Sequence, residues 1–486
     1  MSLRRSLAWA FSGQFTSFAV QFVGSIIVAR LLGPREIGIY AISMAAIGIV
    51  QIFATFGLAA YVVRETELTD DMLNGAFTVN ALLAIALTVI IAGLSFVAGP
   101  LLGVPEAGSV LRIVAFGNLF SIATFRPSAM LQREMRFKQL SIISVTNGLM
   151  QASSTVLFAW IGASYLSPAY GSLVAGTVGT ALTLFFGCNH VNFRCSLSSW
   201  RSITKFGMQM MSVSGVAMFS GRLSDLILGR LLGVAALGLY SRASSLSGQI
   251  FENLYGTATR VIFVQLSKEY REGGDWSGTF LRGFSMITAV MWPLLLGIAV
   301  LSRPAILILY GERWLPAALP LAVLMIGQFV VVGFGMNWEL FVIRGETGRQ
   351  ARFEIARMVV GVPIFAVGCF FSLFGASLGK LADALIGLLL YYPHVRRLAE
   401  IGPYEVPTIY GRSIVLTLVA VAPSVVVMFM YNWSAHLPIA VLFSAVGLGI
   451  AFWLVAVLRM PHPLGDEIRG LWRKIFGAQR TTNQLP

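Results

Sequence analysis

Charged and polar residues recur at helical spacing inside two long apolar stretches of the sequence. Arg222 and Asp225 are three residues apart in the stretch 206–232, so on a helix they share a face. In the next stretch, 237–264, a polar stripe falls within an arc of roughly 80° of a helix; its members are Arg242, Ser245, Gln249, Glu252, Gly256 and Arg260. Arginine pairs bidentately with phosphate oxygens, so this chemistry suits an anionic, phosphate-bearing ligand.

Two further candidates lie in the first part of the chain. Arg126 comes after Asn118, Ser121 and Thr124 in a weaker polar face, and Gln21 belongs to a purely polar face formed by Gln14, Ser17, Gln21 and Ser25. The acidic members, Asp225 and Glu252, could hold arginines when a site is empty, or exchange a proton or Na⁺. The alternative is that all these groups pair within and between helices and only fix the bundle.

Several remaining residues are weaker candidates. Lys380 and Asp383, again three apart, predict a local ion pair near the outer surface, and Glu339 is expected to meet water at the inner end of its helix. Cys188, His190 and Cys195 lack the fourth ligand that a structural zinc site needs, so no metal is expected. The sequence Gly375–Lys380 falls short of a phosphate-binding loop, and no hydrolase constellation is present.

The composition explains what must surround these residues. Of the 486 residues, 57% are hydrophobic and 12% are charged, with a mean hydropathy of +0.79, whereas soluble domains carry about 25% charged residues. Lipid must therefore be the solvent for most of the apolar surface. The net charge of +14 comes without a nucleic-acid-binding motif and fits the Lys and Arg of cytoplasmic loops.

Fourteen apolar stretches are long enough to span a membrane as helices. They lie near 7–31, 37–63, 76–99, 110–131, 139–162, 169–188, 206–232, 237–264, 279–302, 316–341, 353–374, 376–398, 411–431 and 437–458. Lys and Arg gather in alternate connections, for example at Arg133, Arg136 and Lys138. The positive-inside rule then places both termini in the cytoplasm, which requires an even number of spans.

A repeat at an offset of 200 residues organises these spans. Ile27–Tyr40 matches Ile227–Tyr240 at seven of fourteen positions, including one Arg, two Gly and the Tyr. Six spans separate the copies, so both halves insert the same way up as parallel repeats. We expect six-helix bundles at 1–195 and 196–400, two additional helices at 401–460 and a cytoplasmic tail at 461–486. Gly33 and Gly233 are expected to end the first helix of each half in a tight turn.

Several of these segments together resemble one family. Ala29–Tyr40, Leu131–Phe137, Gly221–Asp225, Tyr240–Ala243 and Thr259–Phe263 resemble the Wzx-type polysaccharide transporters of the MOP flippase superfamily. One departure is Val264-Gln265, where members of the family often carry Pro-Ala. The resemblance implies an all-α membrane protein with two pseudo-symmetric bundles around a central cavity. It also implies flipping of an undecaprenyl-pyrophosphate-linked oligosaccharide across the bacterial inner membrane for polysaccharide export.

The function expected from the sequence is therefore alternating-access transport, without an enzymatic activity or a bound cofactor. The partners would be the lipid-linked oligosaccharide, membrane lipids and the polysaccharide polymerase or export machinery. A MATE-like multidrug/cation antiporter is a rival function, and its cavity should be acidic or aromatic because its cargo is usually cationic. A membrane-embedded glycosyltransferase or polymerase would need an outer domain, for which the outer loops are too short. A scaffold without transport would leave the charged stripe unexplained.

Overall fold

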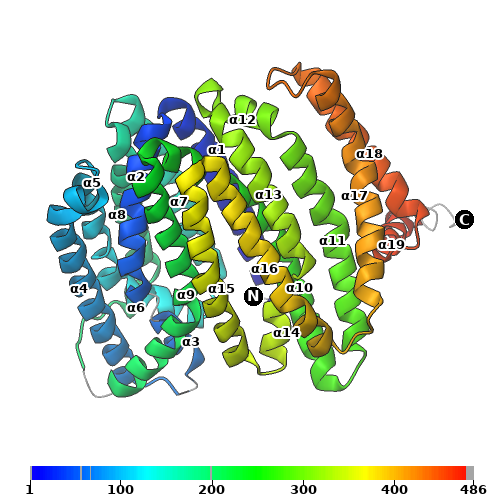
Figure 1. Ribbon diagram of the computed structural model, residues 1–486. Helices are drawn as coiled ribbons and strands as arrows, with labels where there is room; N and C mark the ends of the chain where they lie inside the picture. The colour runs from blue at the N-terminus through cyan, green and yellow to red at the C-terminus, as the bar shows by residue number, and fades with distance from the viewer. Residues whose placement is uncertain (1–2, 55–56, 66, 197–199, 478–486) are drawn as a thin grey trace, which may run out of the picture. The chain divides into compact units, whose positions relative to one another are not determined.

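Helices account for all the regular structure in the described part of the chain, which comprises residues 3–54, 57–65, 67–196 and 200–477 of a computed structural model (Figure 1). A helix or a broken helix occupies each of the fourteen stretches predicted to span the membrane. The all-α prediction is confirmed. The chain divides into two compact units, Met1–Ser241 and Arg242–Pro486.

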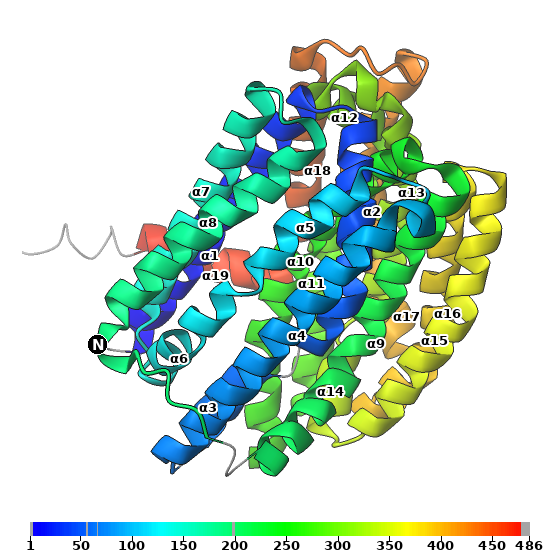
Figure 2. The same cartoon turned by 90° about the vertical axis from the view of Figure 1, so that its left-hand side faces the viewer.

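Unit 1 contains nine helices and the first turns of a tenth. They are α1 (Leu3–Leu31), α2 (Pro34–Val50), α3 (Leu58–Arg64), α4 (Asp70–Leu102), α5 (Ala107–Gly117), α6 (Phe120–Arg133), α7 (Phe137–Trp160), α8 (Ser167–Phe186), α9 (Trp200–Leu232) and the start of α10 (Val234–Glu272). Helix α7 packs along both α1 and α8 (Figure 2), while α9 packs on α2 and α4. The repeat places α9 in the second half, so the predicted boundary at residue 195 differs from this division and stays a prediction.

Unit 2 contains the rest of α10 and nine further helices. They are α11 (Trp276–Val300), α12 (Ser302–Tyr310), α13 (Ala318–Gly333), α14 (Asn337–Ile343), α15 (Thr347–Phe371), α16 (Leu373–Ala399), α17 (Glu405–Met430), α18 (Ile439–Arg459) and α19 (Pro463–Gly477). Helix α16 packs on α15 and α13, while α17 packs between α11 and α18. The packing therefore runs from helix to helix without strands in the described residues.

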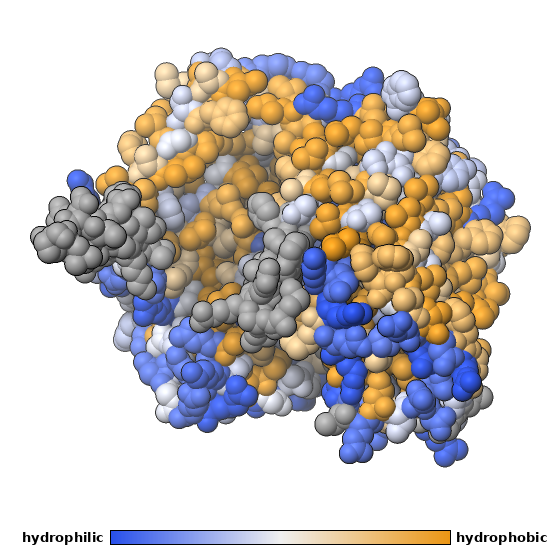
Figure 3. Space-filling model, turned by 180° about the vertical axis from the view of Figure 1, so that it is seen from behind, coloured by the Kyte–Doolittle hydropathy of each residue, from blue (hydrophilic) through white to orange (hydrophobic). Residues whose placement is uncertain are grey.

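Length and apolar character identify most of these helices as membrane spans. In the described residues, ten helical segments are long and apolar enough to cross a membrane, and the bent pair α5 and α6 raises the number to eleven. The three remaining predicted spans are α1, α9 and α10, which carry the polar and charged residues. Figure 3 shows a mostly apolar face with hydrophilic residues gathered toward its lower edge.

The repeated turns differ in their backbone conformation. Gly233, between α9 and α10, has φ of +85°, as a helix-ending glycine does. Gly33 instead has φ of −86° and ψ of 175°, and Pro34 then starts α2. The prediction of a matching glycine turn at Gly33 is therefore wrong, because the residue before a proline favours the extended conformation.

Helix α2 and the start of α10 cross in very close contact within unit 1. A Cβ atom added to Gly38 would lie 1.7 Å from the carbonyl oxygen of Val234, and one added to Gly238 would lie 1.9 Å from that of Pro34. These four residues are two pairs of repeat equivalents, so the crossing is reciprocal. Only glycine lets the two backbones approach this far.

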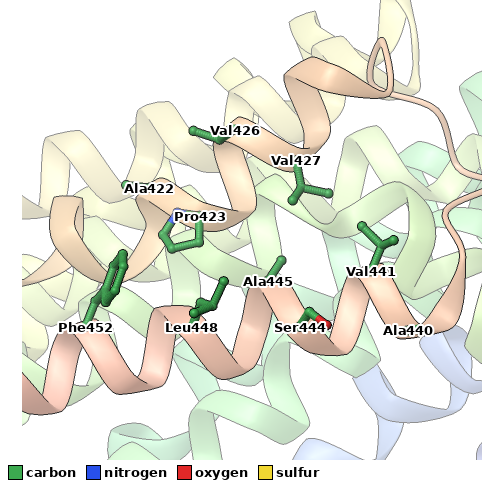
Figure 4. Close-up of a pocket in the computed structure, with 10 residues that line it drawn as sticks. All are labelled: Ala422, Pro423, Val426, Val427, Ala440, Val441, Ser444, Ala445, Leu448 and Phe452. Carbon is green, nitrogen blue, oxygen red and sulfur yellow. The ribbon is translucent and has the colours of Figure 1, made fainter.

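The last helices of unit 2 enclose an apolar groove, and the terminal helix α19 packs against its neighbours. Ten residues of α17 and α18, all apolar except Ser444, line a cavity of about 460 Å³ (Figure 4). Helix α19 lies in the segment that was predicted as a tail and packs on α11 and α18.

A buried histidine holds the start of α19. His462 Nδ1 accepts from the N–H of Leu464 at 3.2 Å, so Nε2 carries the proton and donates to Ser285 Oγ at 2.9 Å. Burial, followed by the positive charge of Arg412, lowers the pKa of His462. The docked helix therefore uses the neutral ring.

Candidate functional site

The polar stripe predicted on α10 lies on one continuous helix. Of its charged members, Glu252 and Arg260 are exposed. A Cβ on Gly256 would lie 3.7 Å from Glu252 Oε2 and 3.9 Å from Arg260 Nη2, so the two charged ends approach each other over this glycine. Arg260 Nε also donates to the Gly256 carbonyl at 2.9 Å. This part of the stripe presents one acidic and one basic group side by side.

At the N-terminal end of the stripe, Arg242 packs against two aromatic rings. The guanidinium of Arg242 lies 5.6 Å from the ring centre of Tyr310 and 5.7 Å from that of Trp314, and both rings are buried. Gln249 Nε2 donates to Ser245 Oγ at 3.0 Å. Cation–π contacts of this kind stabilise a packed helix pair. Arg242 therefore has a structural role in unit 2, whatever else it binds.

Arg222 and Asp225 form the predicted pair on α9, in unit 1. Arg222 Nη1 lies 3.8 Å from Asp225 Oδ2, and the side chains are 37% and 28% exposed. The side chain of Arg222 passes over Gly48 of α2, where an added Cβ would lie 2.5 Å from Nε. Because the ion pair is long and partly exposed, the guanidinium keeps hydrogen-bonding capacity for a further anionic group.

The two candidates from the first half differ in their surroundings. Arg126 on α6 is buried, with Nη1 donating to Asn74 Oδ1 at 2.7 Å and Nη2 lying 3.7 Å from Asp70 Oδ1. These contacts connect α6 to the start of α4, which favours a structural role. Gln21 is exposed on α1. The binding roles of the predicted residues therefore stay predictions.

A charged cluster between α15 and α16 was missed from the sequence. Arg357 Nη2 donates to Asp383 Oδ2 at 3.0 Å, and Nη1 lies 3.5 Å from Glu354 Oε1. The hydroxyl of Tyr391 donates to the same Glu354 oxygen at 2.6 Å. Asp383 was predicted to pair locally with Lys380, and its ion pair with Arg357 also reaches the neighbouring helix. The i, i+3 spacing of Glu354 and Arg357 inside a span was the available signal.

Glu339 is the second residue whose surroundings differ from the prediction. It was expected to meet water, yet it is 8% exposed. The chain breaks between α13 and α14 just before it, and Glu339 lines a pocket together with residues of α10. In the described residues, there is no group of three or more His, Cys, Asp or Glu side chains that could hold a metal ion.

Comparisons with known proteins agree with this architecture. The lipopolysaccharide biosynthesis protein WzxC of Escherichia coli K12 is 23% identical over 401 residues, covering 81% of each chain. A structure of the lipid II flippase MurJ in an inward closed conformation matches with a TM-score of 0.73 at 13% identity, over 92% of this chain and 98% of that one. An inward-facing multidrug resistance MATE family transporter matches with a TM-score of 0.63 at 15% identity, over 80% and 96%.

The family model described as "Polysaccharide biosynthesis protein" matches residues 27–319, more than half of the chain. The match covers the repeated turns, the charged helix α9 and the whole of the α10 stripe. The chain therefore belongs to the polysaccharide biosynthesis protein family.

Proposed function

We propose that this protein flips an undecaprenyl-pyrophosphate-linked oligosaccharide across the bacterial inner membrane by alternating access. The names of its relatives support the substrate class, since WzxC takes part in lipopolysaccharide biosynthesis and MurJ is a lipid II flippase. Both termini would lie in the cytoplasm, and a proton or Na⁺ gradient would drive transport. The central cavity expected from the family resemblance is part of this proposal.

One observation carries the proposal: α9 and α10 keep charged side chains exposed although both helices belong to an otherwise apolar bundle. An ionised group at the centre of a bilayer costs roughly 2.5–3.5 kcal/mol on insertion scales, so lipid cannot be its surroundings. Arg222 and Arg260 therefore face water or substrate for part of the transport cycle. A pyrophosphate supplies the anionic oxygens that an arginine binds well.

The test is a flipping assay with purified protein in vesicles and a fluorescent polyprenyl-pyrophosphate oligosaccharide. Arg222→Ala and Arg260→Ala should each slow flipping by about tenfold or more, because a hydrogen bond to a charged group is worth about 1.5–3 kcal/mol. Arg303→Ala is the matched control, since this arginine is exposed at the start of α12 and donates to the Trp433 carbonyl. Wild-type rates in both α9 and α10 variants would refute the assigned role.

A MATE-like antiporter is the second candidate, favoured by one pocket in unit 2. Phe251, Glu252, Tyr255, Trp338 and Glu339 line it, which is the acidic and aromatic character that cationic cargo requires. The same vesicles, loaded with a cationic dye instead of the lipid-linked sugar, separate the two functions. Dye efflux without sugar flipping would support this candidate and overturn the first.

A further inference from the structure

A break in one membrane span opens a polar pocket inside unit 2. Helix α13 ends at Gly333, and Met336 takes φ of +59° before α14 begins at Asn337. The freed N–H of Met336 donates to the Tyr255 hydroxyl on α10 at 2.7 Å. The pocket between α10 and this break has a volume of about 400 Å³. Irregular backbone at membrane depth is tolerated where it lines such a cavity.

Glu339 is the buried acid of this pocket. It lines the cavity and is 8% exposed, yet no Lys, Arg or His of the described chain lies within 4.0 Å of its carboxylate. The Thr259 hydroxyl, which lines the same cavity, is a neutral group and donates to the Gly256 carbonyl at 3.5 Å. A buried carboxylate without a counter-charge carries a desolvation penalty of several kcal/mol, which neutral donors offset only in part. One positive charge in the pocket would therefore balance the Glu339 carboxylate.

The other polar groups of the pocket are oxygen atoms. The Tyr255 hydroxyl oxygen accepts from the Met336 N–H, and Tyr255 and Glu252 both line the cavity. Two carboxylates and two hydroxyls form a hard, oxygen-rich set of ligands. Because no group of three acidic or metal-binding side chains occurs in the described residues, the set suits a monovalent charge.

In the described residues, the helices packed around α14 bring no Lys, Arg or His within 4.0 Å of the Glu339 carboxylate. Helices α15 and α16 meet it through Phe341, against which Phe353, Tyr391 and His394 pack. The Tyr391 hydroxyl already donates to Glu354. On α10 the basic group nearest in sequence to the pocket is Arg260, whose guanidinium approaches Glu252 over Gly256.

We propose that Glu339, with Glu252, Tyr255 and Thr259, binds one exchangeable positive charge, either a proton on its carboxylate or a dehydrated Na⁺. The inference rests on the proposed function and names the site at which the driving ion acts. Loading neutralises Glu339 and so lowers the cost of keeping the pocket closed around it. Unloading restores the buried charge and favours a state in which water reaches the carboxylate.

A binding test that does not need transport comes first. The melting temperature of the purified protein in detergent is measured while pH is lowered at constant salt, and while Na⁺ replaces choline at constant pH. Ions that bind only the folded state raise this temperature. The wild type should respond to one of the two titrations. Glu339→Gln should show no rise in melting temperature in either titration and should keep only the fall below about pH 6.5 that His462 causes. It should melt at least as high as the loaded wild type, because the neutral amide replaces the buried charge.

Glu312→Gln is the matched control. It makes the same chemical change at the other end of the same helical segment, where the side chain is 62% exposed and pairs with His436. This variant should titrate as the wild type does. A response to Na⁺ identifies sodium as the ion, and a response to pH alone identifies the proton. Equal responses of wild type and Glu339→Gln, or no response of the wild type, would overturn the site.

The link to transport is measured in the flipping vesicles with an imposed gradient of the identified ion. The gradient should accelerate wild-type flipping by about fivefold or more, in line with usual coupling energies, and leave Glu339→Gln unaffected. Gradient-responsive flipping by Glu339→Gln would overturn this inference and leave the proposed function standing. A wild type that binds the ion but flips no lipid-linked sugar would overturn the proposed function and leave the site standing.

Discussion

Replacing Gly38 with alanine tests the close crossing of α2 and α10. The new methyl group would lie 1.7 Å from the Val234 carbonyl oxygen, whereas real Cβ contacts stay beyond 3.0 Å, so the backbones must separate by at least 1.3 Å. No side-chain rotation can relieve a clash with backbone. Overpacking costs about 3 kcal/mol at its usual upper limit. Alanine is more favourable than glycine inside a helix by about 1 kcal/mol, so the net loss of folding free energy is about 2 kcal/mol.

The assay is a thermal melt of the purified protein, followed by intrinsic fluorescence. A loss of about 2 kcal/mol lowers the melting temperature by about 4–8 °C in a domain of this size. Gly93→Ala on α4 is the control, because nothing lies within 4 Å of its added Cβ atom. This control should melt at or slightly above the wild-type temperature.

The reciprocal geometry makes a sharper test possible. Gly238→Ala clashes with the Pro34 carbonyl oxygen at 1.9 Å, in the same crossing. Once one alanine has separated the backbones, the second has less to displace. The double variant should therefore lose less stability than the two single variants added together. Strict additivity, or a Gly38→Ala protein that melts like Gly93→Ala, would refute the crossing.

Two further predictions concern unit 2. Folding lowers the pKa of His462, so the unfolded chain binds the proton more tightly than the folded protein does. The neutral ring therefore contributes stability above about pH 6.5, and this contribution is lost as the pH falls below that value. In melting curves, His462→Gln should remove this pH dependence. Asp383→Asn should cost about 1.5–3 kcal/mol in denaturant titrations, the range for a hydrogen bond to a charged group, because the pair is only partly buried and Glu354 still accompanies Arg357. Lys380→Gln should lower the free energy of unfolding clearly less than Asp383→Asn. A larger loss for Lys380→Gln would support the local Lys380–Asp383 pair expected from the sequence.

Periodicity and repeated residues predicted most of the fold. Each of the fourteen stretches became a helix or a broken helix, because a chain in lipid has few other ways to satisfy its backbone groups. The turn at Gly33 was predicted wrongly, since the same residue type serves a left-handed turn in one copy and precedes Pro34 in the other. A repeat shows equivalence of position and not equality of conformation.

The candidate site was less predictable than the fold. Helical spacing correctly indicated that Arg222 and Asp225 share a face, because both lie on one helix. Pairing across helices, as between Arg357 and Asp383, depends on packing that spacing within one helix does not contain. The burial of Glu339 depends on the break at Met336, a left-handed non-glycine residue that no sequence rule indicates.

The reciprocal contact of Gly38 and Gly238 has a consequence for the ancestry of the molecule. If a half-length ancestor paired with its own copy, the same patch would have met itself across a two-fold axis, as in an isologous homodimer. Every charge in such a dimer appears twice. Fusion into one polypeptide removed that constraint, so Arg222 and Asp225 have Phe22 and Ser25 as their counterparts. A single covalent chain could thus acquire an ion pair on one side only, which no symmetric assembly permits.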